Sequence, residues 1–196
     1  MIGHARARRA SQVHADVDAL RLVHLGEHAL GELETSAKLA VEAGFDGIEL
    51  HGANGYLIEQ FLNVASNQRS DRWGGTVENR ARFAIEAARR TAAAIGADRV
   101  GIRLSPHGVF NGTGAYPDVE AQVLALTKEL SELGILYVHL LDHSAMGAPP
   151  VPADVPRRAL LAALGTREPP VTHLLCFASE VTGGGGVVVG LFGRQE

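Results

Sequence analysis

The feature that most constrains this chain is a threefold alternation of helical and strand patterns in its central part. Three segments carry an apolar stripe at spacings of three and four, and a short apolar run follows each of them. The predicted helices are 28–43, 77–95 and 118–133, and the predicted strands are 47–51, 99–104 and 136–140. The connections are long enough for parallel crossovers. This order predicts an α/β protein with a parallel sheet.

The two ends of the chain lack this regularity. Residues 1–28 show no sustained periodicity, and prolines interrupt the chain repeatedly after about residue 155. Within that tail, residues 157–164 are a candidate helix, and 171–177 and 187–192 are candidate strands. The fold prediction therefore rests on the central segment.

Composition excludes several classes of protein. With 18 basic and 22 acidic residues the net charge is −4, which gives no basic surface for nucleic acid. No apolar run approaches the roughly 18–20 residues of a membrane span, and the basic N-terminus is not followed by a signal-like apolar stretch. The single cysteine, Cys176, excludes an internal disulfide. We therefore expect a cytoplasmic protein without nucleic-acid or membrane partners.

Polar side chains gather directly after the first predicted strand. His51, Asn54 and Tyr56 lie within six residues and are separated by glycine and alanine, which let a ligand approach the backbone. In parallel α/β folds, functional groups collect at the carboxyl ends of strands. Histidine and asparagine can both donate to one oxygen, and a tyrosine hydroxyl can deliver a proton. The alternative is a polar strand-to-helix turn that only caps a helix.

Arg103 is the unusual residue of the second strand, because it stands among apolar neighbours. A buried arginine is rarely left unpaired, so it should meet either an electron-rich ligand or a carboxylate. Glu49 on the neighbouring strand is the candidate partner for a purely structural ion pair. The sequence leaves both interpretations open.

Three further features carry weaker signals. The group His139, Asp142 and His143 suggests a metal, but it stands at a strand end and no third histidine motif supports it. Cys176 fits a buried small hydrophobic residue better than a nucleophile. The glycine run 183–186 precedes a strand, whereas a dinucleotide fingerprint follows one and opens a helix. We therefore predict no metal site.

Three collinear segments resemble the Old Yellow Enzyme family, the FMN-dependent NADH:flavin oxidoreductases. They read AGFDGIELHGANGYL over 43–57, SNQRSDRWGG over 66–75 with Glu-Asn-Arg at 78–80, and GADRVGIRLSP over 96–106. A weaker match covers 144–149. The resemblance extends over about residues 30–155.

The resemblance implies a (β/α)₈ barrel that binds FMN at its C-terminal mouth. By that likeness His51 and Asn54 hold the substrate carbonyl or nitro oxygen, Tyr56 is the catalytic proton donor, and Arg103 lies beside the flavin ring. The implied reaction passes a hydride from NAD(P)H through FMN to an electron-poor alkene. Two donors at the activating oxygen would stabilise the charge that develops there.

The length of the chain limits the resemblance. Eight βα units of roughly 30 residues need about 240 residues, and this chain has 196. We therefore expect a partial (β/α)₈ TIM barrel whose first strands and C-terminal units are missing or degenerate. The expected parts are a poorly matching segment 1–28, the barrel units 29–156 and a degenerate segment 157–196.

The degenerate tail bears on cofactor binding and on association. Gly193 and Arg194 resemble the phosphate-binding turn of the family, although the chain ends two residues later. The alternative function is therefore a non-catalytic remnant that cannot hold FMN. A sheet that does not close leaves strand edges exposed, so we also expect marginal stability or self-association. The expected partner is otherwise a small-molecule substrate.

Overall fold

The computed structural model describes residues 26–143, 148, 173–178 and 189–192. In chain order the elements are a helix over 26–42, β1 (Gly47–Gly52), α2 (Leu57–Leu62), α3 (Val77–Ile95), a 3-10 turn (Ala97–Arg99), β2 (Val100–Leu104), α4 (Val119–Glu132), β3 (Tyr137–Asp142), β4 (His173–Ala178) and β5 (Val189–Phe192). All three predicted helices and all three predicted strands of the central segment are confirmed.

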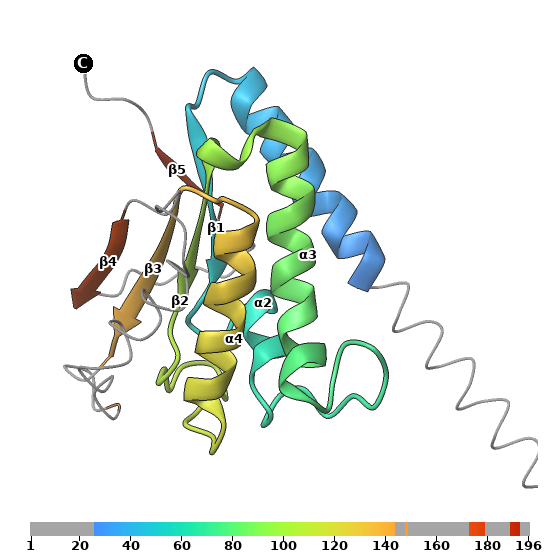
Figure 1. The fold of residues 1–196 in the computed structure, drawn as a ribbon, viewed down its shortest axis with the longest axis vertical. Helices are drawn as coiled ribbons and strands as arrows, with labels where there is room; N and C mark the ends of the chain where they lie inside the picture. Colours follow the sequence, from blue (N-terminus) through green and yellow to red (C-terminus); the bar gives the residue numbers. More distant parts are fainter. Residues whose placement is uncertain (1–25, 144–147, 149–172, 179–188, 193–196) are drawn as a thin grey trace, which may run out of the picture.

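The five strands form one sheet in the order β4-β3-β2-β1-β5 (Figure 1). The pairs β1–β2, β2–β3 and β3–β4 are parallel and follow the order of the chain. A helix precedes each of β1, β2 and β3, and the helices lie on one side of the sheet. Four parallel strands in sequence order are the arrangement of a partial (β/α) barrel.

The strand β5 departs from this pattern, because it pairs with β1 in the antiparallel direction. Val189 lies opposite Leu50, and Phe192 lies opposite Gly47. Both candidate strands of the tail are therefore strands, but only β4 continues the parallel sheet. The candidate helix 157–164 and residues 1–25 lie outside the described residues.

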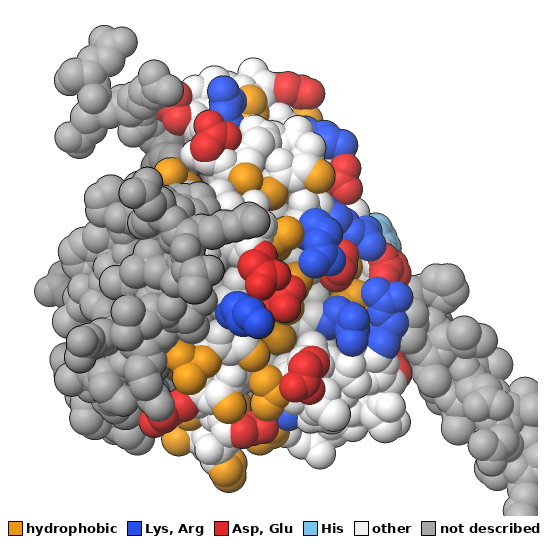
Figure 2. Space-filling model, in the orientation of Figure 1, with side chains coloured by type: hydrophobic (Ala, Val, Ile, Leu, Met, Phe, Trp, Pro, Cys, Tyr) orange, Lys and Arg blue, Asp and Glu red, His pale blue; other side chains and the backbone are white. Residues whose placement is uncertain are grey.

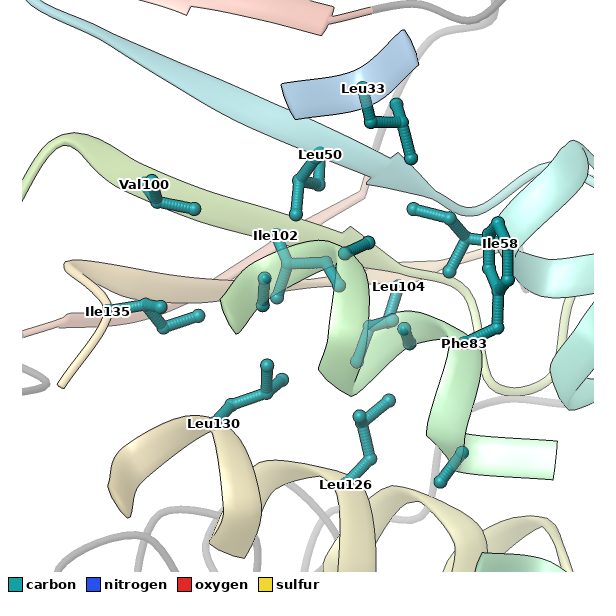
Figure 3. Close-up of a cluster of buried hydrophobic side chains, with 14 of the residues drawn as sticks. Leu33, Leu50, Ile58, Phe83, Val100, Ile102, Leu104, Leu126, Leu130 and Ile135 are labelled. Carbon is teal, nitrogen blue, oxygen red and sulfur yellow. The ribbon is translucent and has the colours of Figure 1, made fainter. Parts of the chain in front are cut away.

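The hydrophobic core lies between the sheet and the helices. Alternate residues along a strand point to opposite faces, and one face of this sheet is apolar. Figure 3 shows the buried side chains that fill this layer. Those on the strands are Ile48, Leu50, Val100, Ile102, Leu104, Val138 and Leu140, and those on α3 and α4 include Phe83, Ala84, Ala88, Leu126 and Leu130. Each large side chain contributes about 1.5–3 kcal/mol by burial, and the alanines of α3 let that helix approach the sheet closely.

The helical side of the molecule is strongly charged. Figure 2 shows acidic and basic side chains interspersed over the helices, and a shallow groove between α3 and α4 is lined by both kinds. Mixed charge of this type is typical of a solvated helix face. No helix in the described part of the chain is long and apolar enough to cross a membrane.

Candidate active site

The second face of the sheet carries the polar residues. His51 of β1 lies opposite Arg103 of β2, and Arg103 lies opposite His139 of β3. Register partners on neighbouring strands point to the same face, so these three side chains form a row across the sheet. The row lies near the carboxyl edge, which we define as the edge where β1, β2 and β3 end.

Glu49 lies on the same face of the sheet and contacts two members of this row, Arg103 and His139. Its carboxylate lies 2.9 Å from Arg103 Nε and 3.2 Å from His139 Nδ1, and it also accepts a hydrogen bond from Tyr137. Burial raises the pKa of Glu49, but the hydrogen bond from His139 and the charge of Arg103 outweigh burial, and the pKa is lowered overall. Glu49 is therefore ionised at neutral pH and holds Arg103 in place.

The ion pair that the sequence left open for Arg103 is thus present. Both of its contacts in the row run through Nε, which lies 2.9 Å from Glu49 Oε1 and 3.2 Å from His139 Nδ1. The two terminal nitrogens of the guanidinium are not used by these contacts. About a third of the side chain is exposed, so Arg103 can hold an electron-rich ligand while it stays paired.

His51 and Tyr56 lie against each other. Their ring centroids are 5.1 Å apart with the planes tilted by 49°, and both side chains are half-buried. Burial and the neighbouring charge of Arg103 lower the pKa of His51, against the opposite effect of Glu49. His51 is therefore a neutral imidazole at pH 7, with one N–H that can donate to a ligand.

Asn54 stands in a turn that holds it in an uncommon conformation. Its φ is 58°, and its backbone N–H donates to Ser105 Oγ at 2.9 Å while its carbonyl accepts from Asn111 Nδ2 at 2.8 Å. The next residue, Gly55, has a φ of 72°, and a Cβ there would lie 2.6 Å from the carbonyl oxygen of Phe110. The turn is therefore fixed by its backbone and packs against the loop after β2.

The side chain of Asn54 is the one group of this turn with an unsatisfied buried atom. Its Oδ1 is buried and has no hydrogen-bond partner among the described residues. A buried polar atom without a partner is uncommon and costs about 1–3 kcal/mol. An amide oxygen only accepts, so a hydrogen-bond donor on a ligand would satisfy this atom.

Glu59 and Ser105 are site residues that the sequence reasoning missed. Glu59, on α2, is only 6% exposed, and it accepts the Gly55 N–H at 2.6 Å and the Ser105 hydroxyl at 2.9 Å. Burial raises its pKa to about 7 even though both hydrogen bonds act in the opposite direction. The available signal was a glutamate three residues after Tyr56, the spacing at which a first-turn carboxylate reaches back to the start of its helix.

The remaining sequence-predicted residues lie elsewhere. Gly193 and Arg194 are outside the described residues. The strand that leads to them, β5, ends with Phe192 opposite Gly47, which is the first residue of β1. The last residue of β5 therefore lies at the edge of the sheet opposite to His51 and Arg103.

The residues that suggested a metal have other surroundings. His139 contacts Glu49 and Arg103, and the buried ring of His143 packs edge-on against Phe110 with centroids 5.0 Å apart. In the parts of the chain that the structure describes, no three histidine, cysteine, aspartate or glutamate side chains are grouped to hold a metal ion. Cys176 lies in β4.

Fold and site together define a segment of a (β/α) barrel with hydrogen-bond donors and a fixed arginine near its carboxyl edge. The sequence model of the NADH:flavin oxidoreductase / NADH oxidase family matches residues 27–150, more than half of the chain. The chain belongs to this family, and the resemblance stated from its motifs is confirmed.

Named relatives match the same central part. "Aldehyde reductase FrzD" of Cladobotryum sp is 55% identical over 105 residues, which are 54% of this chain and 28% of that protein. "Probable inactive dehydrogenase easA" of Claviceps fusiformis is 48% identical over 117 residues, 59% of this chain and 31% of the relative. The chain thus spans about three tenths of the length of these relatives.

Solved structures show the same relation. The Old Yellow Enzyme homologue from Zymomonas mobilis superposes with a TM-score of 0.68 and 30% identity, and the match covers 80% of this chain and 42% of that one. Morphinone reductase gives a TM-score of 0.66 and 33% identity over 70% of this chain and 37% of that one. The predicted partial barrel fold is confirmed.

Proposed function

We propose that this chain carries the substrate-binding edge of an FMN-dependent oxidoreductase that transfers a hydride from NAD(P)H to an electron-poor alkene. The observation that carries the proposal is the row of His51 and Arg103 as register partners on adjacent parallel strands, with Asn54 and Tyr56 in the turn after β1. Membership of a flavin oxidoreductase family supports the same reaction class.

His51 and Asn54 are the proposed donors to the activating oxygen of the substrate. A neutral His51 donates one N–H. Asn54 would donate through its side-chain NH₂ group, because an amide oxygen only accepts. Both groups are held before substrate arrives, so little reorganisation is needed when negative charge develops on the oxygen. Loss of one such donor typically costs about 10²–10³ in rate.

Tyr56 is the proposed proton donor. Its ring contacts His51, so a substrate oxygen bound by His51 lies in the neighbourhood of the tyrosine. A phenol keeps its proton at neutral pH and can give it to the carbon that becomes saturated. This assigns binding to His51 and Asn54 and proton delivery to Tyr56.

Arg103 is the residue that fits the flavin. When bound, FMN would supply the hydride-transfer chemistry, and a cation beside its ring favours the reduced, anionic form. Arg103 has terminal nitrogens beyond its contacts with Glu49 and His139, so it can meet this need. A phosphate contact by Gly193 and Arg194, which lie outside the described residues, stays a prediction.

A second candidate is a non-catalytic segment that keeps this edge but does not hold FMN. It is favoured by the antiparallel β5, which lies on the outer edge of β1. FMN titration of the purified chain, followed by quenching of flavin fluorescence, separates the two candidates. Saturable quenching supports the first candidate, and unquenched flavin at excess protein supports the second.

The roles are tested in the flavin-loaded chain by measuring its two half-reactions separately in a stopped-flow instrument. We expect Tyr56→Phe to slow oxidation by an enone about 10²–10⁴-fold and to leave reduction by NAD(P)H nearly unchanged. His51→Ala should instead weaken the binding of a phenol ligand. Equal damage to both half-reactions by Tyr56→Phe would remove the tyrosine from the proton-donor role.

A further inference from the structure

A buried carboxyl group holds the turn that carries Asn54 and Tyr56. The two oxygens of Glu59 accept the Gly55 N–H and the Ser105 hydroxyl, and Ser105 Oγ in turn accepts the Asn54 N–H. Two successive backbone N–H groups of the turn are thus tied, directly or through Ser105, to one side chain. These ties join α2, the turn after β1 and the residue that follows β2.

Among the residues that the structure describes, no cation pairs with Glu59. Its hydrogen bonds come from two neutral donors, the Gly55 N–H and the Ser105 hydroxyl. Tyr116, from the loop before α4, also faces it, and burial raises the pKa of Tyr116, so that phenol stays neutral. Arg80 of α3 and Asp118 pair with each other beyond Tyr116.

We propose that Glu59 is a positioning residue that acts through Ser105, so that the proton state of this one carboxyl sets the orientation of Asn54 and Tyr56. The proposal rests on the proposed function, because only there do these two side chains act on a substrate. Glu59 itself touches neither substrate nor cofactor in this scheme.

The two proton states differ at Ser105. An ionised Glu59 only accepts, so the Ser105 hydroxyl must point toward it and its lone pairs stay available to the Asn54 N–H. A protonated Glu59 can donate to Ser105 Oγ, and the hydroxyl proton then turns away. Ser105 Oγ then accepts from both Glu59 and the Asn54 N–H, so the hydrogen bond to Asn54 shares this oxygen with a second donor when Glu59 gains a proton. Burial places this change near pH 7, where the lowered pKa of His51 leaves that ring already neutral.

The test is an NMR pH titration of the isotopically labelled chain, which requires neither flavin nor turnover. We expect the chemical shift of the Gly55 amide proton to titrate with a single midpoint near pH 7, because its acceptor becomes a carboxylate. The chemical shifts of the Asn54 backbone amide and of the Tyr56 ring should titrate with the same midpoint. Glu59→Gln should abolish all three midpoints. Glu34→Gln, in the half-exposed pair with Lys38 on the helix over 26–42, should leave them unchanged.

Two outcomes overturn the proposal. If Gly55 titrates but Asn54 and Tyr56 do not, Glu59 is a structural group of α2 only. If Gly55 shows no midpoint that depends on Glu59, the carboxyl does not control the turn. Where Glu59→Gln does not fold, Ser105→Ala provides the second variant: Gly55 should still titrate, and Asn54 should not. Titration of Asn54 in Ser105→Ala would exclude Ser105 as the link. If FMN does not bind, the proposed function is wrong, but the NMR titration still decides whether Glu59 controls the turn.

Discussion

Gly101→Ala tests the packing of the polar face of the sheet. Gly101 lies in β2 between Glu49 of β1 and Tyr137 of β3 in the register of the sheet. A Cβ at Gly101 would lie 2.3 Å from Tyr137 Cζ and 2.6 Å from both Cε atoms. Carbon atoms in contact are normally about 3.5–4.0 Å apart, so the ring would have to move by roughly 1–1.5 Å.

The expected cost has two parts. Overpacking of this kind costs about 1–3 kcal/mol, and the displaced Tyr137 also loses its hydrogen bond to the partly buried Glu49 carboxylate, which is worth about 1.5–3 kcal/mol. Because partial relaxation reduces the sum, we expect Gly101→Ala to lower the free energy of unfolding by about 2–4 kcal/mol. Urea unfolding followed by circular dichroism measures it.

Gly31→Ala is the matched control, since a Cβ at Gly31 meets nothing within 4 Å. Gly31 lies within the helix over 26–42, where alanine should stabilise by about 0.5–1 kcal/mol. In a Tyr137→Ala background the ring is gone, and Gly101→Ala should then cost less than about 1 kcal/mol. Two results would show that the contact with Tyr137 is not the reason for a glycine at position 101. One is a Gly101→Ala variant with the unfolding free energy of the wild type. The other is an equal loss of unfolding free energy in the wild-type and Tyr137→Ala backgrounds.

Two further predictions concern buried charged groups. Burial raises the pKa of Glu59 from 4.5 to about 7, so the folded chain holds this proton more tightly than the unfolded chain does. The protonated carboxyl therefore contributes its full share of the unfolding free energy below pH 4.5, and this share is lost as the pH rises through 7. The unfolding free energy of the wild type minus that of Glu59→Gln, measured by urea titration, should therefore fall by about 3 kcal/mol between pH 4.5 and 7. A difference that does not depend on pH would contradict the raised pKa of Glu59. Arg80→Ala should cost about 3–5 kcal/mol, because a guanidinium only 4% exposed binds two backbone carbonyls and Asp118. Arg89→Ala, at an exposed site on the same helix, should stay within about 0.5 kcal/mol, and equal losses for both variants would refute the role of burial.

The central elements were predictable because their signals are local. Each helix over 77–95 and 119–132 shows its apolar stripe within its own sequence, and each strand shows a short run of buried residues. Parallel pairing follows from the crossover order, and pairing in order places the residues after β1 and those of β2 at one edge. The neighbourhood of His51 and Arg103 could therefore be predicted without coordinates.

Only the tertiary structure decided which partners these residues have. The sequence left Arg103 between a ligand and Glu49, and the register of β1, β2 and β3 brought Glu49 to both Arg103 and His139, 90 residues away. In the sequence Glu59 resembles an ordinary helix residue. In the structure α2 places it beneath the turn, where it accepts a hydrogen bond from Ser105, 46 residues later. The antiparallel direction of β5 likewise had no local signal. Such contacts depend on where distant segments pack, because hydrogen bonds and burial act through space, whereas periodicity records only which face of each element is apolar.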